Sequence, residues 1–87
     1  MEEDFDKLEK QFGKLLGLLQ PSLDASEKKE IREYINVNEF GVALEALVDI
    51  LVVKGRALEK EPCTLLRKMA NSLGLKGEVA RIDKSLS

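Results

Sequence analysis

The chain has 87 residues, of which 44% are hydrophobic and 34% are charged, and its formal net charge is −2. This composition is typical of a single globular domain, which we expect to span residues 1–87, and it excludes a disordered acidic tail. Histidine is absent and Cys63 is the only cysteine in the sequence. Imidazole metal ligands, a thiolate zinc site and an internal disulfide are therefore excluded.

Three further absences in the sequence restrict the possible partners. No apolar run approaches the roughly 20 residues of a membrane span, the N-terminus is acidic, and no run of basic residues forms a stripe. We therefore expect a soluble, cytoplasmic protein with no cofactor, which binds neither a membrane nor a nucleic acid.

The first predicted helix covers residues 2–19 and ends before Pro21, because the residue preceding a proline disfavours the α conformation. We expect Gly13 and Gly17 to allow another helix to approach closely. One helical face carries the apolar residues, namely Phe5, Leu8, Phe12, Leu15, Leu16 and Leu19.

A second helix is predicted to begin after Asp24, which forms a capping box with Glu27. Its apolar stripe consists of Ile31, Tyr34 and Ile35. Asn38 is the expected N-cap of a third helix over residues 39–54, after which Gly55 follows. This third helix is the most apolar part of the chain and is expected to be central, with a core face of Phe40, Ala43, Leu44, Leu47, Ile50 and Leu51.

A fourth helix is predicted to start at Glu61-Pro62 and to end at Leu73-Gly74-Leu75, a typical Schellman pattern. Its stripe is Leu66, Met69, Ala70 and Leu73, and a short final helical segment is expected within residues 78–86. No segment alternates with the period of a strand. The predicted fold is all-α, a compact bundle of four helices plus a short C-terminal helix.

The charge is unevenly distributed along the chain. Residues 1–49 contain 12 acidic and 6 basic residues, a net of −6, whereas residues 50–87 contain 4 acidic and 8 basic residues, a net of +4. An acidic face suits a basic partner, because complementary fields speed encounter and reject wrong partners. A solvated surface with an accidental asymmetry of sign is the alternative interpretation.

One face of the third predicted helix carries Val42, Glu45, Asp49 and Val52. Either the valines pack under neighbouring helices while the carboxylates reach water, or the face is an exposed strip that binds a basic target. Glu45 and Asp49 lie one turn apart, but no further ligand pattern or phosphate-binding loop accompanies them. We therefore expect neither catalysis nor metal binding.

In the second predicted helix, the acids Glu27, Glu30 and Glu33 alternate with basic residues, a pattern typical of an ion-paired solvated face. Cys63 lies in the first turn of the fourth helix, where we expect a structural role.

Residues 34–49, with the sequence YINVNEFGVALEALVD, contain a helix end, a polar turn and the opening of a new helix. This stretch resembles the small helical immunity proteins of bacterial polymorphic-toxin systems, especially the MafI-like and contact-dependent growth inhibition types. The resemblance extends over about residues 27–76 and includes the step Leu73-Gly74-Leu75. Val37 departs from the pattern, which has a polar residue or glycine there, and Gly41 is expected to lie in close contact with the preceding helix.

The resemblance implies a cytosolic antidote that binds a cognate toxin C-terminal domain, commonly a nuclease with a basic cleft. It would be a monomer or a weak homodimer when free. Acids of the second and third helices would pair with basic toxin residues around an apolar centre. The expected partner-binding residues are Glu30, Glu33, Glu39, Val42, Glu45, Asp49 and Val52.

The alternative is a helical oligomerisation or adaptor module without enzymatic activity. In that case Val42, Val52, Leu18 and Leu65 would contact a second copy of the chain.

Overall fold

The computed structural model describes residues 2–55 and 57–86, with side chains from residue 5 onward. This part of the chain contains helices and turns but no strand, so the all-α prediction is confirmed. The helices are α1 (Glu2–Leu18), α2 (Ala25–Asn36), α3 (Phe40–Lys54), α4 (Lys60–Ser72) and α5 (Lys76–Arg81), with a 3-10 turn, η1 (Gln20–Ser22), and a π-helical turn, η2 (Ile82–Leu86).

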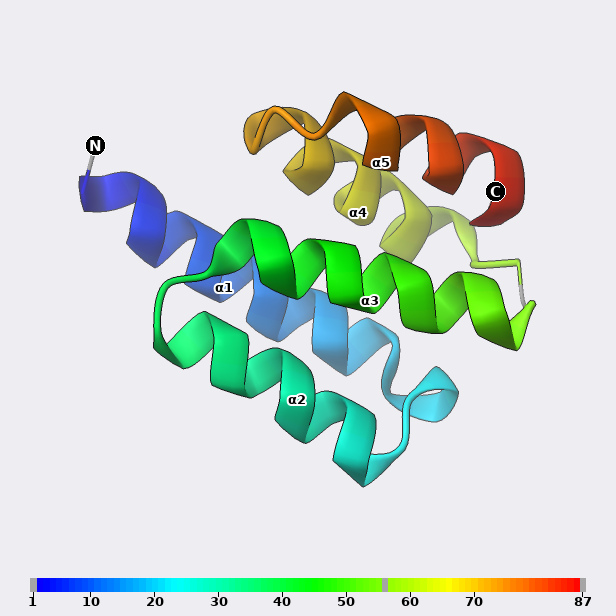
Figure 1. Ribbon diagram of the computed structural model, residues 1–87, viewed down its shortest axis with the longest axis horizontal. Coiled ribbons are helices and arrows are strands. Elements are labelled where there is room, and N and C mark those ends of the chain that lie inside the picture. The colour runs from blue at the N-terminus through cyan, green and yellow to red at the C-terminus, as the bar shows by residue number, and fades with distance from the viewer. Residues whose placement is uncertain (1, 56, 87) are drawn as a thin grey trace.

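In Figure 1, α3 crosses the middle of the molecule, with α2 on one side and the α4–α5 pair on the other. Helix α2 packs against α3, α1 packs against α4, and both α5 and η2 contact α3 and α4. The radius of gyration is 11.7 Å, close to the roughly 12 Å expected for a folded chain of this length. The chain is therefore compact, as predicted.

Helix α3 supplies a large share of the core, as its apolar sequence predicts. Val48 is fully buried although it lies outside the predicted core face, whereas Ile50 is only half-buried. The Phe40 ring lies against Phe12 of α1, with 6.1 Å between the ring centroids. The buried residues of α3 are Phe40, Ala43, Leu44, Leu47, Val48 and Leu51.

The C-terminal segment is built into the core rather than added to its surface. It begins at Lys76 instead of Glu78, and the side chains of Ile82 and Leu86 have no exposed surface. The Leu58 backbone N–H donates a 2.7 Å hydrogen bond to the Leu86 carbonyl, which ties the α3–α4 connection to the end of the chain.

Two predicted helix boundaries are confirmed by their hydrogen bonds. The Asp24 carboxylate accepts from the Glu27 N–H at 2.8 Å, and the Glu27 carboxylate accepts from the Asp24 N–H at 3.0 Å. After α4, Gly74 has a φ of 72° and the Leu75 N–H bonds the Ala70 carbonyl at 2.9 Å, which is a Schellman ending. Both boundaries use local chemistry that is visible in the sequence.

The role predicted for Asn38 is wrong. Asn38 has a φ of 61°, and its N–H bonds the Ile35 carbonyl at 3.0 Å, while the Glu39 N–H bonds the Tyr34 carbonyl at 2.9 Å. This Schellman arrangement ends α2, because asparagine tolerates the left-handed conformation. Glu39 occupies the N-cap position of α3, without a side-chain cap.

Predictions for one aromatic residue and three glycines are also wrong. Phe5 belongs to the apolar face predicted for the first helix, but it is 49% exposed because it lies near the start of α1; its ring centroid is 5.6 Å from that of Phe40. A Cβ added at Gly13, Gly17 or Gly41 would meet nothing within 4 Å. These glycines therefore mark no close approach between helices.

Candidate partner-binding surface

A shallow groove runs between α2 and α3 on the outer side of the molecule. We call this surface the α2–α3 groove; its lining residues are Glu30 and Tyr34 of α2 and Val42, Glu45, Ala46, Asp49 and Ile50 of α3. Within each helix these residues recur at one-turn spacing, so they share a face. The packing of α2 on α3 brings the two faces together.

Four of the seven predicted partner-binding residues meet in this groove, namely Glu30, Val42, Glu45 and Asp49. The floor is apolar, since Tyr34, Ala46 and Ile50 are half-buried and pack against the core. Val42 is 41% exposed. The groove thus combines apolar surface with carboxylates.

The other three predicted residues lie elsewhere. Glu33 points away from the groove, into a depression on the opposite flank of α2. Glu39 is exposed in the turn before α3, and Val52 is half-buried and packs against the core. The seven residues therefore do not form one continuous surface.

Asp49 is already paired within the chain. Its carboxylate lies 2.6 Å from the Arg81 guanidinium, which is also 3.4 Å from Glu78. The hydrogen bond to Asp49 is the main cause that raises the pKa of Arg81 above its ordinary value. Arg81 does not line the groove, but it contacts one of its residues; the sequence alone does not reveal this pair, because Arg81 is 32 positions away from Asp49 and belongs to another helix.

Glu30 and Glu45, by contrast, are exposed and have no ion-pair partner among residues 2–55 and 57–86. The ion pairs expected within α2 are also missing from this described part of the chain. Glu27 instead pairs with Lys54 of α3, at 2.9 Å. The charges of α2 are therefore available to groups outside the helix.

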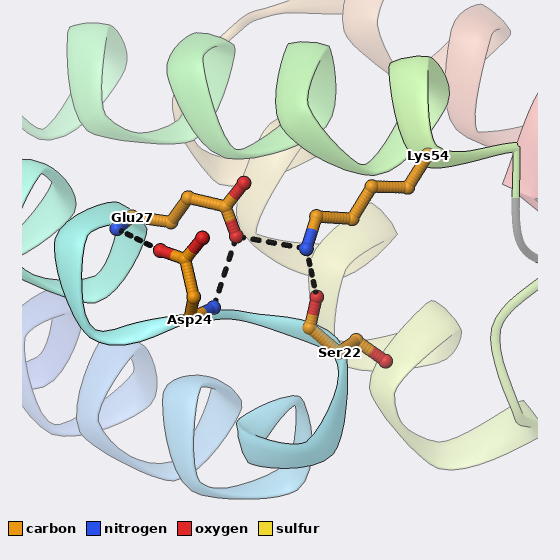
Figure 2. Close-up of polar contacts among 4 residues, drawn as sticks. All are labelled: Ser22, Asp24, Glu27 and Lys54. Carbon is orange, nitrogen blue, oxygen red and sulfur yellow. Dashed lines mark hydrogen bonds and ion pairs between the residues drawn. The ribbon is translucent and has the colours of Figure 1, made fainter.

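The Glu27–Lys54 pair fixes one end of α2 against α3, as Figure 2 shows. Lys54 Nζ also donates to the Ser22 carbonyl of η1 at 2.8 Å, so one ammonium group joins three elements. The hydrogen bond from Lys54 is the main cause that lowers the pKa of Glu27, and the Asp24 N–H adds to the effect. This cluster joins the start of α2 to the end of α3, beside the α2–α3 packing contacts that form the groove.

Other kinds of site have little support in the described part of the chain. No group of three or more potential metal-ligating side chains occurs there. Cys63 is buried in the first turns of α4. Within the same residues, no helix has both the length and the apolar character needed to cross a membrane.

The apolar residues of the predicted oligomerisation module do not form an exposed patch. Val52 and Leu65 pack against the core, and Leu18 is half-buried. No family model matches the chain, and neither a curated protein nor a solved structure matches it significantly.

Proposed function

We propose that this chain is an immunity protein of a bacterial polymorphic-toxin system, which binds a cognate toxin domain through the α2–α3 groove. The toxin is a nuclease, and the acidic groove covers its basic active-site cleft. The resemblance of residues 34–49 to such immunity proteins suggests this class of function. The protein acts in the cytoplasm as a binding protein and not as an enzyme.

The observation that carries the proposal is the composition of the groove. Interfaces draw affinity from a buried apolar centre and selectivity from complementary charge around it. Val42 supplies exposed apolar surface, and the unpaired carboxylates of Glu30 and Glu45 line the same groove. Because neither carboxylate has a cation of its own, a lysine or arginine of the partner pairs with each without displacing an internal bond.

In this proposal the four longer helices form the bundle, and the short C-terminal segment completes it by packing against α3 and α4. Arg81 holds Asp49 at the edge of the groove. Because Asp49 is already paired with Arg81, it does not contact the partner directly, whereas Glu30 and Glu45 do.

A co-expression experiment tests the function. The chain carries a tag, and the prey is the C-terminal domain encoded by the open reading frame immediately upstream. Co-elution, together with rescue of growth, is the expected result. A folded toxin domain that neither co-elutes nor loses toxicity would contradict the proposal.

A charge-reversal variant tests the site. Glu30→Lys combined with Glu45→Lys is expected to weaken toxin affinity at least about tenfold, since like charges would then face each other. The matched control, Asp6→Lys with Glu9→Lys, changes the net charge equally on α1 and is expected to bind normally. Equal affinity of the two double variants would mean that the toxin binds elsewhere on the molecule.

A further inference from the structure

Arg81 brings a positive charge to the edge of the α2–α3 groove. Its helix, α5, packs on α3 from the side opposite α2 (Figure 1), and its guanidinium lies 2.6 Å from the Asp49 carboxylate. Glu78, three residues earlier on α5, lies 3.4 Å from the same guanidinium. Two carboxylates from two helices therefore hold this cation beside the groove.

The Arg81–Asp49 pair lies close to both unpaired carboxylates of the groove. Glu45 precedes Asp49 by four residues, so the two positions are about 6 Å apart along α3. The helices α2 and α3 run antiparallel, since the ion pair at the start of α2 joins the end of α3. Glu30, in the first half of α2, therefore lies level with the second half of α3, which contains Asp49.

This pair matters more for the charge of the groove than for the stability of the fold. Both side chains are substantially exposed, and solvent weakens such pairs. A charge nevertheless acts on other charges over about 8 Å at physiological ionic strength, a range that includes the groove beside Asp49. Arg81 thus leaves two carboxylates available to a partner and repels a further cation.

We propose that Arg81 determines which basic partner the groove accepts. It keeps Asp49 out of the contact, so that the groove pairs with two cations, at Glu30 and Glu45, and repels a third cation beside Asp49. Juxtaposed like charges reject a wrong partner more strongly than a missing contact does. The inference rests on the proposed binding of a basic toxin domain, and it adds the charge pattern of the toxin: two cations, and no cation opposite Arg81.

The variant Arg81→Gln tests this role with two probes, a hexalysine peptide and the toxin domain of the co-expression experiment. Hexalysine is positively charged at every position, so it should bind the variant about three- to tenfold more tightly than the wild type at low salt. The toxin domain should gain at most about twofold, because it places no cation beside Asp49. Loss of Arg81 thus lowers the preference of the chain for the toxin.

The two affinities are measured separately. Titration of the isotope-labelled chain with hexalysine gives the first affinity, from the amide signals of the groove residues. Calorimetry gives the affinity for the toxin domain. A gain of affinity cannot come from partial unfolding, and far-UV circular dichroism checks that every variant is folded.

Three matched variants separate the role of Arg81 from an effect of net charge. Asp49→Asn/Arg81→Gln keeps the wild-type net charge but lacks the freed carboxylate, so it should bind hexalysine like the wild type. Lys10→Gln removes one positive charge from an exposed position of α1, which does not line the groove, and should show no gain. Arg81→Lys retains the cation and should also stay near the wild type.

Each part of the inference can fail by itself. A hexalysine affinity of Arg81→Gln no higher than that of Lys10→Gln would mean that Arg81 does not repel cations from the groove. A gain that persists in Asp49→Asn/Arg81→Gln would mean that Asp49 is not the group that Arg81 withholds. An equal gain for hexalysine and toxin would mean that Arg81 does not select between partners.

Failure of the proposed function gives a different result. A toxin domain that binds neither the wild type nor any variant would contradict the proposed function. The hexalysine comparison would still decide whether Arg81 controls the access of cations to the groove, because it needs no toxin.

Discussion

The Arg81 guanidinium of α5 lies 2.6 Å from the Asp49 carboxylate of α3 and connects the basic second half of the chain to the acidic first half. The contact neutralises one of three carboxylates that line the α2–α3 groove. It also places a cation beside the surface that we propose for a basic partner. The groove is therefore less acidic than the sequence of α3 alone implies.

Breaking this contact should change stability only slightly. Both side chains are substantially exposed, 62% for Asp49 and 40% for Arg81, and solvent screens such pairs. We expect a coupling free energy below about 1 kcal/mol from a double-mutant cycle of Asp49→Asn and Arg81→Gln, measured by urea unfolding. A coupling well above that value would show that the pair is a major structural contact.

The Glu27–Lys54 pair predicts a pH-dependent stability. The folded-state pKa of Glu27 is lowered below its ordinary value of 4.5, so the pair stabilises the fold above that pH. This contribution is lost as the pH falls through the lowered pKa. Lys54→Met should lower the melting temperature by a few degrees at neutral pH, and the difference from wild type should shrink in acid.

Lys54→Met also removes the hydrogen bond from Lys54 to the Ser22 carbonyl, which does not titrate. The part of the melting-temperature difference that is due to this bond should therefore persist at low pH. Lys68→Met is the matched control, because Lys68 is exposed on α4 and its loss should have no such pH dependence. A Lys54→Met difference that is constant across the acid range would rule out Glu27 as its source.

The glycines of α1 are expected to cost stability without a structural benefit. Gly13 is exposed within the helix and has open space around it, so Gly13→Ala should stabilise the fold by about 1 kcal/mol. Gly74→Ala should destabilise it by roughly 1–2 kcal/mol, because Gly74 has a φ of 72°. Chemical denaturation of the two variants measures both values, and a destabilising Gly13→Ala would reveal a missed packing constraint.

The C-terminal segment should be essential for the fold. Ile82 has no exposed surface, so Ile82→Ala should lower the free energy of unfolding by about 2–5 kcal/mol. Val53 is 85% exposed, so Val53→Ala should change the free energy of unfolding by no more than about 0.5 kcal/mol. Equal effects of the two substitutions would mean that the segment does not belong to the core.

Much of the fold is predictable from local sequence. The Asp24–Glu27 capping box and the Leu73-Gly74-Leu75 ending act within a few residues, and both are found in the structure. The role of Asn38 is ambiguous from local sequence, because asparagine serves both as an N-cap and as a left-handed residue after a helix. Only the hydrogen bonds of Asn38 and Glu39 decide between these roles.

The candidate surface is predictable only in part. The residue spacing alone predicts that Val42, Glu45 and Asp49 share one face of a helix, because helical periodicity is a local property of the backbone. The packed helices are needed to see that Glu30 joins them while Glu33 does not, and that Arg81 neutralises Asp49. Such pairings depend on which helix faces meet and on where each helix ends. The sum of many packing contacts across the core fixes both.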